Sequence, residues 1–315
     1  MSINYSEQDI LRYCQQVVLK AMNHVRATMR GSKRLSLKDT IENPNIAKSQ
    51  DNLTKAVDKE AEDLIIAALI KKFKKITGIT SFTVFSEELG IQTFPEGTDE
   101  KDADLVIFID PIDGTEFIES MQGGWSLMAI YDRKANEAIT AVAGDIFLNR
   151  LYWASKNNYA EALDFTTHSW FKLDGGPNPK TTLEGARINF LTTKAERFLS
   201  VAQQTRLMNA IKENDARINL SWGSNLIVQV AAGYADAAVE FTKGFATYDI
   251  LPGFLIGKKA GLTILDLKGN PIDSTLDLDE VFAAYRTDPK KPERTKFVAA
   301  RSEKLARTIL ELLDV

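Results

Sequence analysis

The spacing of apolar and polar positions predicts two amphipathic helices near the start of the chain. Apolar residues recur at steps of three and four between Ile10 and Val25, as on the buried face of a helix, and Ser6 can cap its first turn. A second pattern of this kind runs between Ala61 and Phe73. Each helix therefore needs a partner surface that covers its apolar face.

Short apolar runs predict the strands. Residues 105–109 form an unbroken run of β-branched, aromatic and leucine side chains, which is typical of a strand buried on both faces. Weaker runs predict further strands at 80–85, 126–131, 138–145, 150–154, 187–191, 262–267 and 297–300. Helical patterns follow at 205–214, 226–232, 249–260 and 302–313.

The order of these elements indicates two halves of different architecture. Hairpin spacing favours a largely antiparallel sheet in the first half, whereas strands alternate with helices in the second. We therefore predict an α/β protein with an α+β domain over residues 1–158, which carries most metal ligands, and an α/β domain over residues 159–315. A stretch rich in Gly and Pro at 174–179 is predicted to lie between the domains.

Composition narrows the classes of function. Of the 315 residues, 44% are hydrophobic, and the net charge of −4 does not indicate a nucleic-acid-binding surface. The single cysteine, Cys14, excludes an internal disulfide and a cysteine zinc cluster, and it favours a reducing compartment. The first residues lack a signal-peptide pattern, and the apolar stretch at 64–70 is too short to cross a bilayer. We expect a cytoplasmic protein without membrane or nucleic-acid partners.

Acidic residues gather where the most apolar strand ends. Asp110 follows the run at 105–109 directly, and Pro111 disfavours a helical conformation for it. Asp113 comes three residues later, just before Gly114. Carboxylates that converge in this way repel one another unless a cation lies between them, and hard divalent cations prefer oxygen ligands. The same residue types are common in turns, so these positions alone leave a simple turn open.

Further acidic motifs extend this pattern over most of the chain. Residues 85–88 read Phe-Ser-Glu-Glu, residues 109–115 read Ile-Asp-Pro-Ile-Asp-Gly-Thr, and Tyr248 and Asp249 open a predicted helix. Together they resemble the inositol monophosphatase family of magnesium-dependent, lithium-sensitive phosphatases, which also includes bisphosphate nucleotidases and fructose bisphosphatases. The resemblance implies a layered αβαβα sandwich of the sugar phosphatase type, a homodimer, and hydrolysis of a phosphate monoester by a metal-activated water.

The resemblance also implies two or three Mg²⁺ ions per active site. The implied ligands are the side chains of Glu87, Asp110, Asp113 and Asp249 and the backbone carbonyl of Ile112. Asp110 is expected to bridge two ions. Glu88, the second acid of its pair, is expected at the surface or behind the ligands.

By the same resemblance, Glu87, Thr115 and Asp58 are the catalytic residues. The attacking water is expected between the first metal, Glu87 and the Thr115 hydroxyl, with Asp58 orienting that hydroxyl through a hydrogen bond. The N–H groups of Gly114 and Thr115 would bind the phosphate. Asp58 matches the acid of the family's Thr-x-x-Asp signature, whereas Thr54 lies four residues before it and does not match the spacing.

The substrate side of the site is expected to include Glu240, which matches a carboxylate that contacts substrate hydroxyls in the family. It lies nine residues before Asp249. Ser224 and Asn225 could line the same pocket or simply cap a helix. The polar connection at 31–53 is either a lid that brings a lysine to the phosphate or a solvated loop.

Three functions remain open from the sequence. The leading hypothesis is a magnesium-dependent phosphatase for a small polyol, inositol or sugar monophosphate, because the Glu240 carboxylate suits hydroxyls and would repel a second phosphate. The first alternative is a 3′(2′),5′-bisphosphate nucleotidase, because residues 114–118 resemble the nucleotidase branch of the family. The second alternative is a catalytically silent, metal-binding regulatory protein. The presence of every implied carboxylate ligand argues against it.

Overall fold

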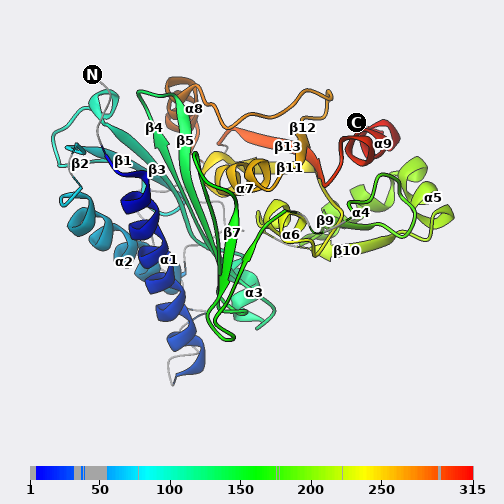
Figure 1. The fold of residues 1–315 in the computed structure, drawn as a ribbon, viewed down its shortest axis with the longest axis horizontal. Coiled ribbons are helices and arrows are strands. Elements are labelled where there is room, and N and C mark those ends of the chain that lie inside the picture. Colours follow the sequence, from blue (N-terminus) through cyan, green and yellow to red (C-terminus); the bar gives the residue numbers. More distant parts are fainter. Residues whose placement is uncertain are drawn as a thin grey trace.

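The computed structural model describes residues 5–31, 37, 39, 55–76, 78–174, 176, 178–221, 223–289 and 292–314. In this part of the chain, two β-sheets alternate with three layers of helices (Figure 1). Most of the connection at 31–53, together with Thr54, lies outside the described residues, so the lid or loop remains a prediction. Within the described ranges, no helix is long and apolar enough to span a membrane.

The first sheet has eight strands in the order β2-β1-β3-β4-β5-β6-β7-β8. Strands β1 and β3 are parallel, and the other neighbouring pairs are antiparallel, which confirms the largely antiparallel sheet. The bounds are β1 Phe82–Ser86, β2 Gly90–Phe94, β3 Leu105–Asp113, β4 Trp125–Asp132, β5 Glu137–Asp145, β6 Arg150–Ser155, β7 Glu161–Asp164 and β8 Ser169–Lys172. Every residue of β3 is buried, as its unbroken apolar run predicts.

The second sheet has five strands in the order β10-β9-β11-β13-β12. Strand β9 runs parallel to β10 and β11, whereas β13 is antiparallel to β11 and β12. The bounds are β9 Arg187–Leu191, β10 Arg217–Ser221, β11 Ala237–Ala246, β12 Thr263–Leu265 and β13 Arg294–Ala300. The mixture of strands and helices in this half agrees with the predicted α/β class.

Helices form the outer and central layers of the sandwich. Helices α1 (Glu7–Arg30) and α2 (Ala56–Phe73) cover the outer face of the first sheet. Between the two sheets lie α6 (Leu226–Ala231), α7 (Thr247–Lys259) and α8 (Leu278–Thr287). The outer face of the second sheet packs against α4 (Ala195–Ala202), α5 (Thr205–Glu213) and α9 (Glu303–Leu312). The layers therefore follow the αβαβα order, as Figure 1 shows.

Alternate residues of the central strands hold these layers together. Ile107 and Ile109 of β3 belong to the apolar cluster under α1 and α2, while Val106 and Phe108 face α7 and α8. This alternation is the reason that the whole run is apolar, since both faces of the strand are covered. Two short elements complete the first half: a 3₁₀ turn at Glu100–Asp102 and helix α3 (Thr115–Glu119), which begins where β3 ends.

The edges of the sheets differ most from the sequence prediction. Strand β7 pairs with β6 and β8 pairs with β7, so the first sheet extends to Lys172 through two strands that were not predicted. These strands have four residues each, and β8 is largely exposed, so they carry little apolar signal. Strands β2 and β10 and helices α4 and α8 were also not predicted. The two strands lie at sheet edges, where tertiary pairing rather than a strong local pattern forms them.

Candidate metal and phosphate site

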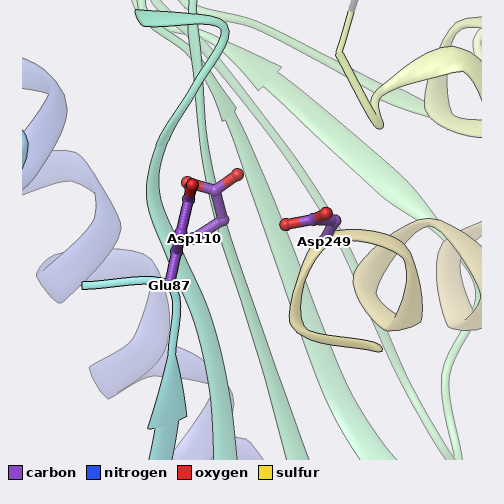
Figure 2. A group of neighbouring side chains, drawn as sticks. All are labelled: Glu87, Asp110 and Asp249. Carbon is purple, nitrogen blue, oxygen red and sulfur yellow. The ribbon is translucent and has the colours of Figure 1, made fainter. Parts of the chain in front are cut away.

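Three carboxylates from distant segments meet at one point. Glu87 lies in the turn after β1, Asp110 near the end of β3, and Asp249 in the first turn of α7. Their ligand oxygens all lie within 4.8 Å of one another (Figure 2). The parallel register that pairs Ser86 with Ile109 explains half of this arrangement, because the acids follow those two residues directly. The structure thus brings together three of the residues that the sequence nominated as ligands.

Asp110 is the most enclosed of the three acids, with 2% of its surface exposed. Its Oδ1 accepts a hydrogen bond from the Ile112 N–H at 3.1 Å, so the chain turns back on the carboxylate around Pro111. Burial raises the pKa of Asp110 well above its ordinary value, and the charges of Glu87, Asp113 and Asp249 add to this effect. A divalent cation among these oxygens would reverse that repulsion, and all three donors are of the kind that Mg²⁺ prefers.

Asp113 is held differently from the other three acids. Its carboxylate accepts the backbone N–H of Ser224 at 2.7 Å, across from the other half of the chain. Gly223 makes this approach feasible: its φ is +74°, and a Cβ there would overlap the Asp113 carboxylate. Burial raises the pKa of Asp113 to about 7. Asp113 therefore borders the group in Figure 2, and Gly223 is a site residue that the sequence reasoning missed.

Asp249 is placed by the start of α7. Its Oδ2 accepts the Ala246 N–H at 3.2 Å, which fixes the carboxylate at the first turn of the helix. Burial and the charges of Glu87 and Asp113 raise its pKa, while Arg294 lowers it. The side chain thus brings negative charge from the second half of the chain to acids supplied by the first.

Thr115 and Asp58 form the hydrogen bond that the resemblance implies. The Thr115 Oγ1 donates to Asp58 Oδ1 at 2.9 Å and also lies 3.1 Å from the Ile112 carbonyl oxygen. The other Asp58 oxygen accepts the Lys55 N–H, so the carboxylate is anchored at the start of α2. Gly114, with φ of +86°, turns the chain between β3 and α3 and places Thr115 beside this pair.

The remaining predicted residues make hydrogen bonds within the protein or lie buried in it. Glu240 is buried, and its Oε1 accepts the N–H groups of Thr242 and Gly244 and the Thr242 hydroxyl at 2.8–2.9 Å. It thereby closes the irregular part of β11, and its contact with substrate remains a prediction. Ser224 is also buried and serves Asp113 through its N–H, while Asn225 begins α6. Glu88 is buried, so the surface position considered for it is wrong.

Three cationic side chains interact electrostatically with one another, and two of them, Lys243 and Arg294, also interact with Asp249. The sequence reasoning missed them because they come from separate segments. This basic cluster consists of Arg197 on α4, Lys243 on β11 and Arg294 on β13. Partial burial, Arg294 and Arg197 lower the pKa of Lys243 to about 8, and the charges of Asp249 and Glu87 act in the opposite direction. Within the described ranges, no ion pair joins any of the three to an acid.

Comparison with known proteins extends these observations. A model of the inositol monophosphatase family matches residues 7–314. A fructose-1,6-bisphosphatase of Pyrococcus furiosus is 26% identical over 263 residues, covering 83% of this chain and 84% of the relative. Human 3′(2′),5′-bisphosphate nucleotidase 1 is 26% identical over 252 residues, covering 74% and 77%. A solved Pyrococcus horikoshii structure with similarities to inositol-1 monophosphatase has a TM-score of 0.65 at 20% identity, covering 97% and 100%.

The sandwich fold, the gathered carboxylates and these matches define the class: a hydrolase that acts on phosphate monoesters. The chain belongs to the inositol monophosphatase family. The family resemblance that the three acidic motifs suggested is therefore confirmed over nearly the whole length of the chain.

Proposed function

We propose that the chain hydrolyses a phosphate monoester of a small polyol, inositol or sugar, with Mg²⁺ as its cofactor. The observation that carries the proposal is the approach of the Glu87, Asp110 and Asp249 oxygens to within 4.8 Å of one another. Carboxylates at this spacing, one buried and two partly buried, are unfavourable without a counter-charge, and a hard divalent cation supplies one. Glu87, Asp110 and Asp249 would hold the metal, with Asp113 and the Ile112 carbonyl beside them.

The bound metal would supply positive charge against the phosphate oxygens and lower the pKa of a water molecule. The protein's own groups orient that reaction. The Thr115 hydroxyl donates a hydrogen bond to Asp58, so a lone pair of its Oγ1 is free to accept a hydrogen bond from the attacking water. Asp58 thereby fixes the direction in which the water presents its own lone pair. The N–H groups of Gly114 and Thr115 are proposed to bind the phosphate, because they start the helix at the end of β3.

The basic cluster favours a second candidate, a substrate with two phosphates. The sequence suggested that Glu240 would repel a second phosphate. In the structure, one oxygen of its carboxylate accepts hydrogen bonds from Thr242 and Gly244. The Glu240 carboxylate keeps its charge and interacts electrostatically with Arg197, as do Glu196 of α4 and Glu116 of α3. Among the described residues none of these three cations forms an ion pair with an acid, so the cluster can bind a second phosphate. The names of the fructose-1,6-bisphosphatase and bisphosphate nucleotidase relatives agree with this candidate.

A phosphate-release assay with Mg²⁺ or EDTA tests both candidates. Inositol monophosphate, fructose 1,6-bisphosphate and adenosine 3′,5′-bisphosphate serve as the panel, and we expect Mg²⁺-dependent release from at least one. If the second candidate is right, Lys243→Ala should raise KM for the bisphosphate about tenfold, whereas exposed Lys212→Ala on α5 should not. Release from no substrate, combined with stabilisation by Mg²⁺, would instead favour a silent metal-binding protein.

We also propose a small phosphorylated metabolite as the only partner class besides a second copy of the chain. The net charge of −4 supports a preference against nucleic acid. A cytoplasmic location, a homodimer and sensitivity to lithium complete the proposal. Size-exclusion chromatography and a lithium titration of the phosphate-release assay test the last two.

A further inference from the structure

Glu62 is a buried acid that the proposed chemistry does not use. It lies on α2, and none of its surface is exposed. Its Oε1 accepts the Leu89 N–H at 3.0 Å and the Ser86 hydroxyl. Ser86 Oγ in turn accepts the same Leu89 N–H at 3.0 Å. One carboxylate oxygen therefore binds both ends of the turn that carries Glu87.

The environment of Glu62 is costly for an acid. Burial raises its pKa to about 7, and the charge of neighbouring Glu88 contributes in the same direction. The Lys59 ammonium lies 3.7 Å from Oε2, which accepts no hydrogen bond among the described residues. An apolar side chain would fill this part of α2 without that cost. What an apolar side chain could not do is hold Ser86 and Leu89 together.

The turn after β1 positions Glu87 relative to Asp110. Ser86 is the last residue of β1 and pairs with Ile109 of β3, one residue before Asp110. Glu87 is the next residue after Ser86, so the conformation of the turn sets the distance between the Glu87 and Asp110 carboxylates. Gly90, with φ of +75°, then starts β2. The antiparallel pairing of Ser86 with Gly90 closes the turn through the backbone, and Glu62 adds a side-chain acceptor that binds both Ser86 and Leu89.

We infer that Glu62 is a positioning residue: by holding Ser86 and Leu89 it keeps Glu87 beside Asp110 and so sets the affinity of the site for its divalent cation. This inference rests on the proposed function only in taking these acids as a metal site. Residues that orient metal ligands typically contribute about 10- to 100-fold in metal affinity. The role is that of an acceptor oxygen, which glutamine also provides.

Calorimetric titration of the full chain with Mg²⁺, at a temperature where every variant is folded, tests the inference. We expect Glu62→Leu to weaken Mg²⁺ binding at least about tenfold and Glu62→Gln to stay within about threefold of the unchanged chain. Asp63→Asn is the matched control: it removes an exposed carboxylate on α2 that also pairs with Lys59, and its affinity should be unchanged. In turnover, Glu62→Leu should need more Mg²⁺ for half-maximal rate, yet recover kcat when Mg²⁺ is saturating.

The possible outcomes separate this inference from the proposed function. If Glu62→Leu melts at a lower temperature but binds Mg²⁺ as tightly as the unchanged chain, Glu62 is merely structural and the inference is overturned. Ser86→Ala removes one of the two contacts while leaving the acid in place, and it should weaken Mg²⁺ binding by a smaller factor even if Glu62→Leu fails to fold. An unchanged chain that binds no Mg²⁺ would overturn the metal site itself.

Discussion

The ring of Tyr248 packs edge-on against the ring of Phe85, with centroids 5.2 Å apart and ring planes at 85°. Phe85 lies two residues before Glu87, and Tyr248 directly precedes Asp249. The contact therefore joins the two halves of the chain immediately beside the carboxylates that each half supplies. Aromatic pairs in this geometry contribute about 0.5–1.5 kcal/mol beyond their buried area. The pair is placed to fix the distance between Glu87 and Asp249.

Removing this ring should damage stability and metal binding together. Tyr248→Ala should cost about 3 kcal/mol of unfolding free energy, because it empties a buried aromatic position, and it should weaken Mg²⁺ binding. Tyr248→Phe keeps the ring and should change either quantity little. Urea unfolding and calorimetric titration with Mg²⁺ measure the two effects. Full Mg²⁺ affinity in a folded Tyr248→Ala protein would contradict the proposed spacing role.

Metal removal should make stability depend on pH in a defined direction. Burial and neighbouring charges raise the pKa of Asp110 and Asp249, and burial raises that of Asp113 to about 7. Such groups bind protons more tightly in the folded than in the unfolded chain, where the pKa is about 3.9. In EDTA, stability should therefore fall as pH rises from about 4 through 7. Stabilisation by Mg²⁺ should grow over the same window, since Mg²⁺ binds the ionised carboxylates.

Melting temperatures in Mg²⁺ and in EDTA, taken from about pH 5 to 8, measure this effect. Asp110→Asn removes the central charge and should shrink both the pH dependence in EDTA and the shift caused by Mg²⁺. The exposed acid Glu213, changed to Gln, is the control and should leave both unchanged. An equal Mg²⁺ shift at both ends of the pH range would be inconsistent with carboxylate ligands whose pKa values are raised.

The hydroxyl of Thr115 should matter for the chemical step more than for binding. Thr115→Val removes the donor to Asp58 and should lower kcat about 100-fold with little change in KM, while Thr115→Ser should keep most of the activity. Steady-state kinetics on the best substrate of the panel provide the measurement. Unchanged kcat in Thr115→Val would exclude this hydroxyl from the orientation of the attacking water.

Local patterns predicted the parts of the site that lie on one strong element. The apolar run before Asp110 predicts a strand buried on both faces, and an acid at the end of such a strand indicates a functional site. The residues that support the site carry no such signal. Glu62 reads as one more polar position on an amphipathic helix, and Arg294 as one charge at the start of a strand. Their significance depends on which segments the fold brings beside them, and that information is tertiary.

The glycine before Ser224 offers a prediction with a close internal control. Gly223 has φ of +74°, and a Cβ there would lie 2.9 Å from the Asp113 carboxyl carbon, whereas Gly261, with φ of +81°, has no atom within 4 Å of such a Cβ. Both Gly→Ala changes should cost about 1–2 kcal/mol of backbone strain. Gly223→Ala should cost more and also weaken Mg²⁺ binding, because the added methyl displaces Asp113. If the two variants lose equal stability and both keep their Mg²⁺ affinity, then the position of Asp113 does not depend on the absence of a side chain at residue 223.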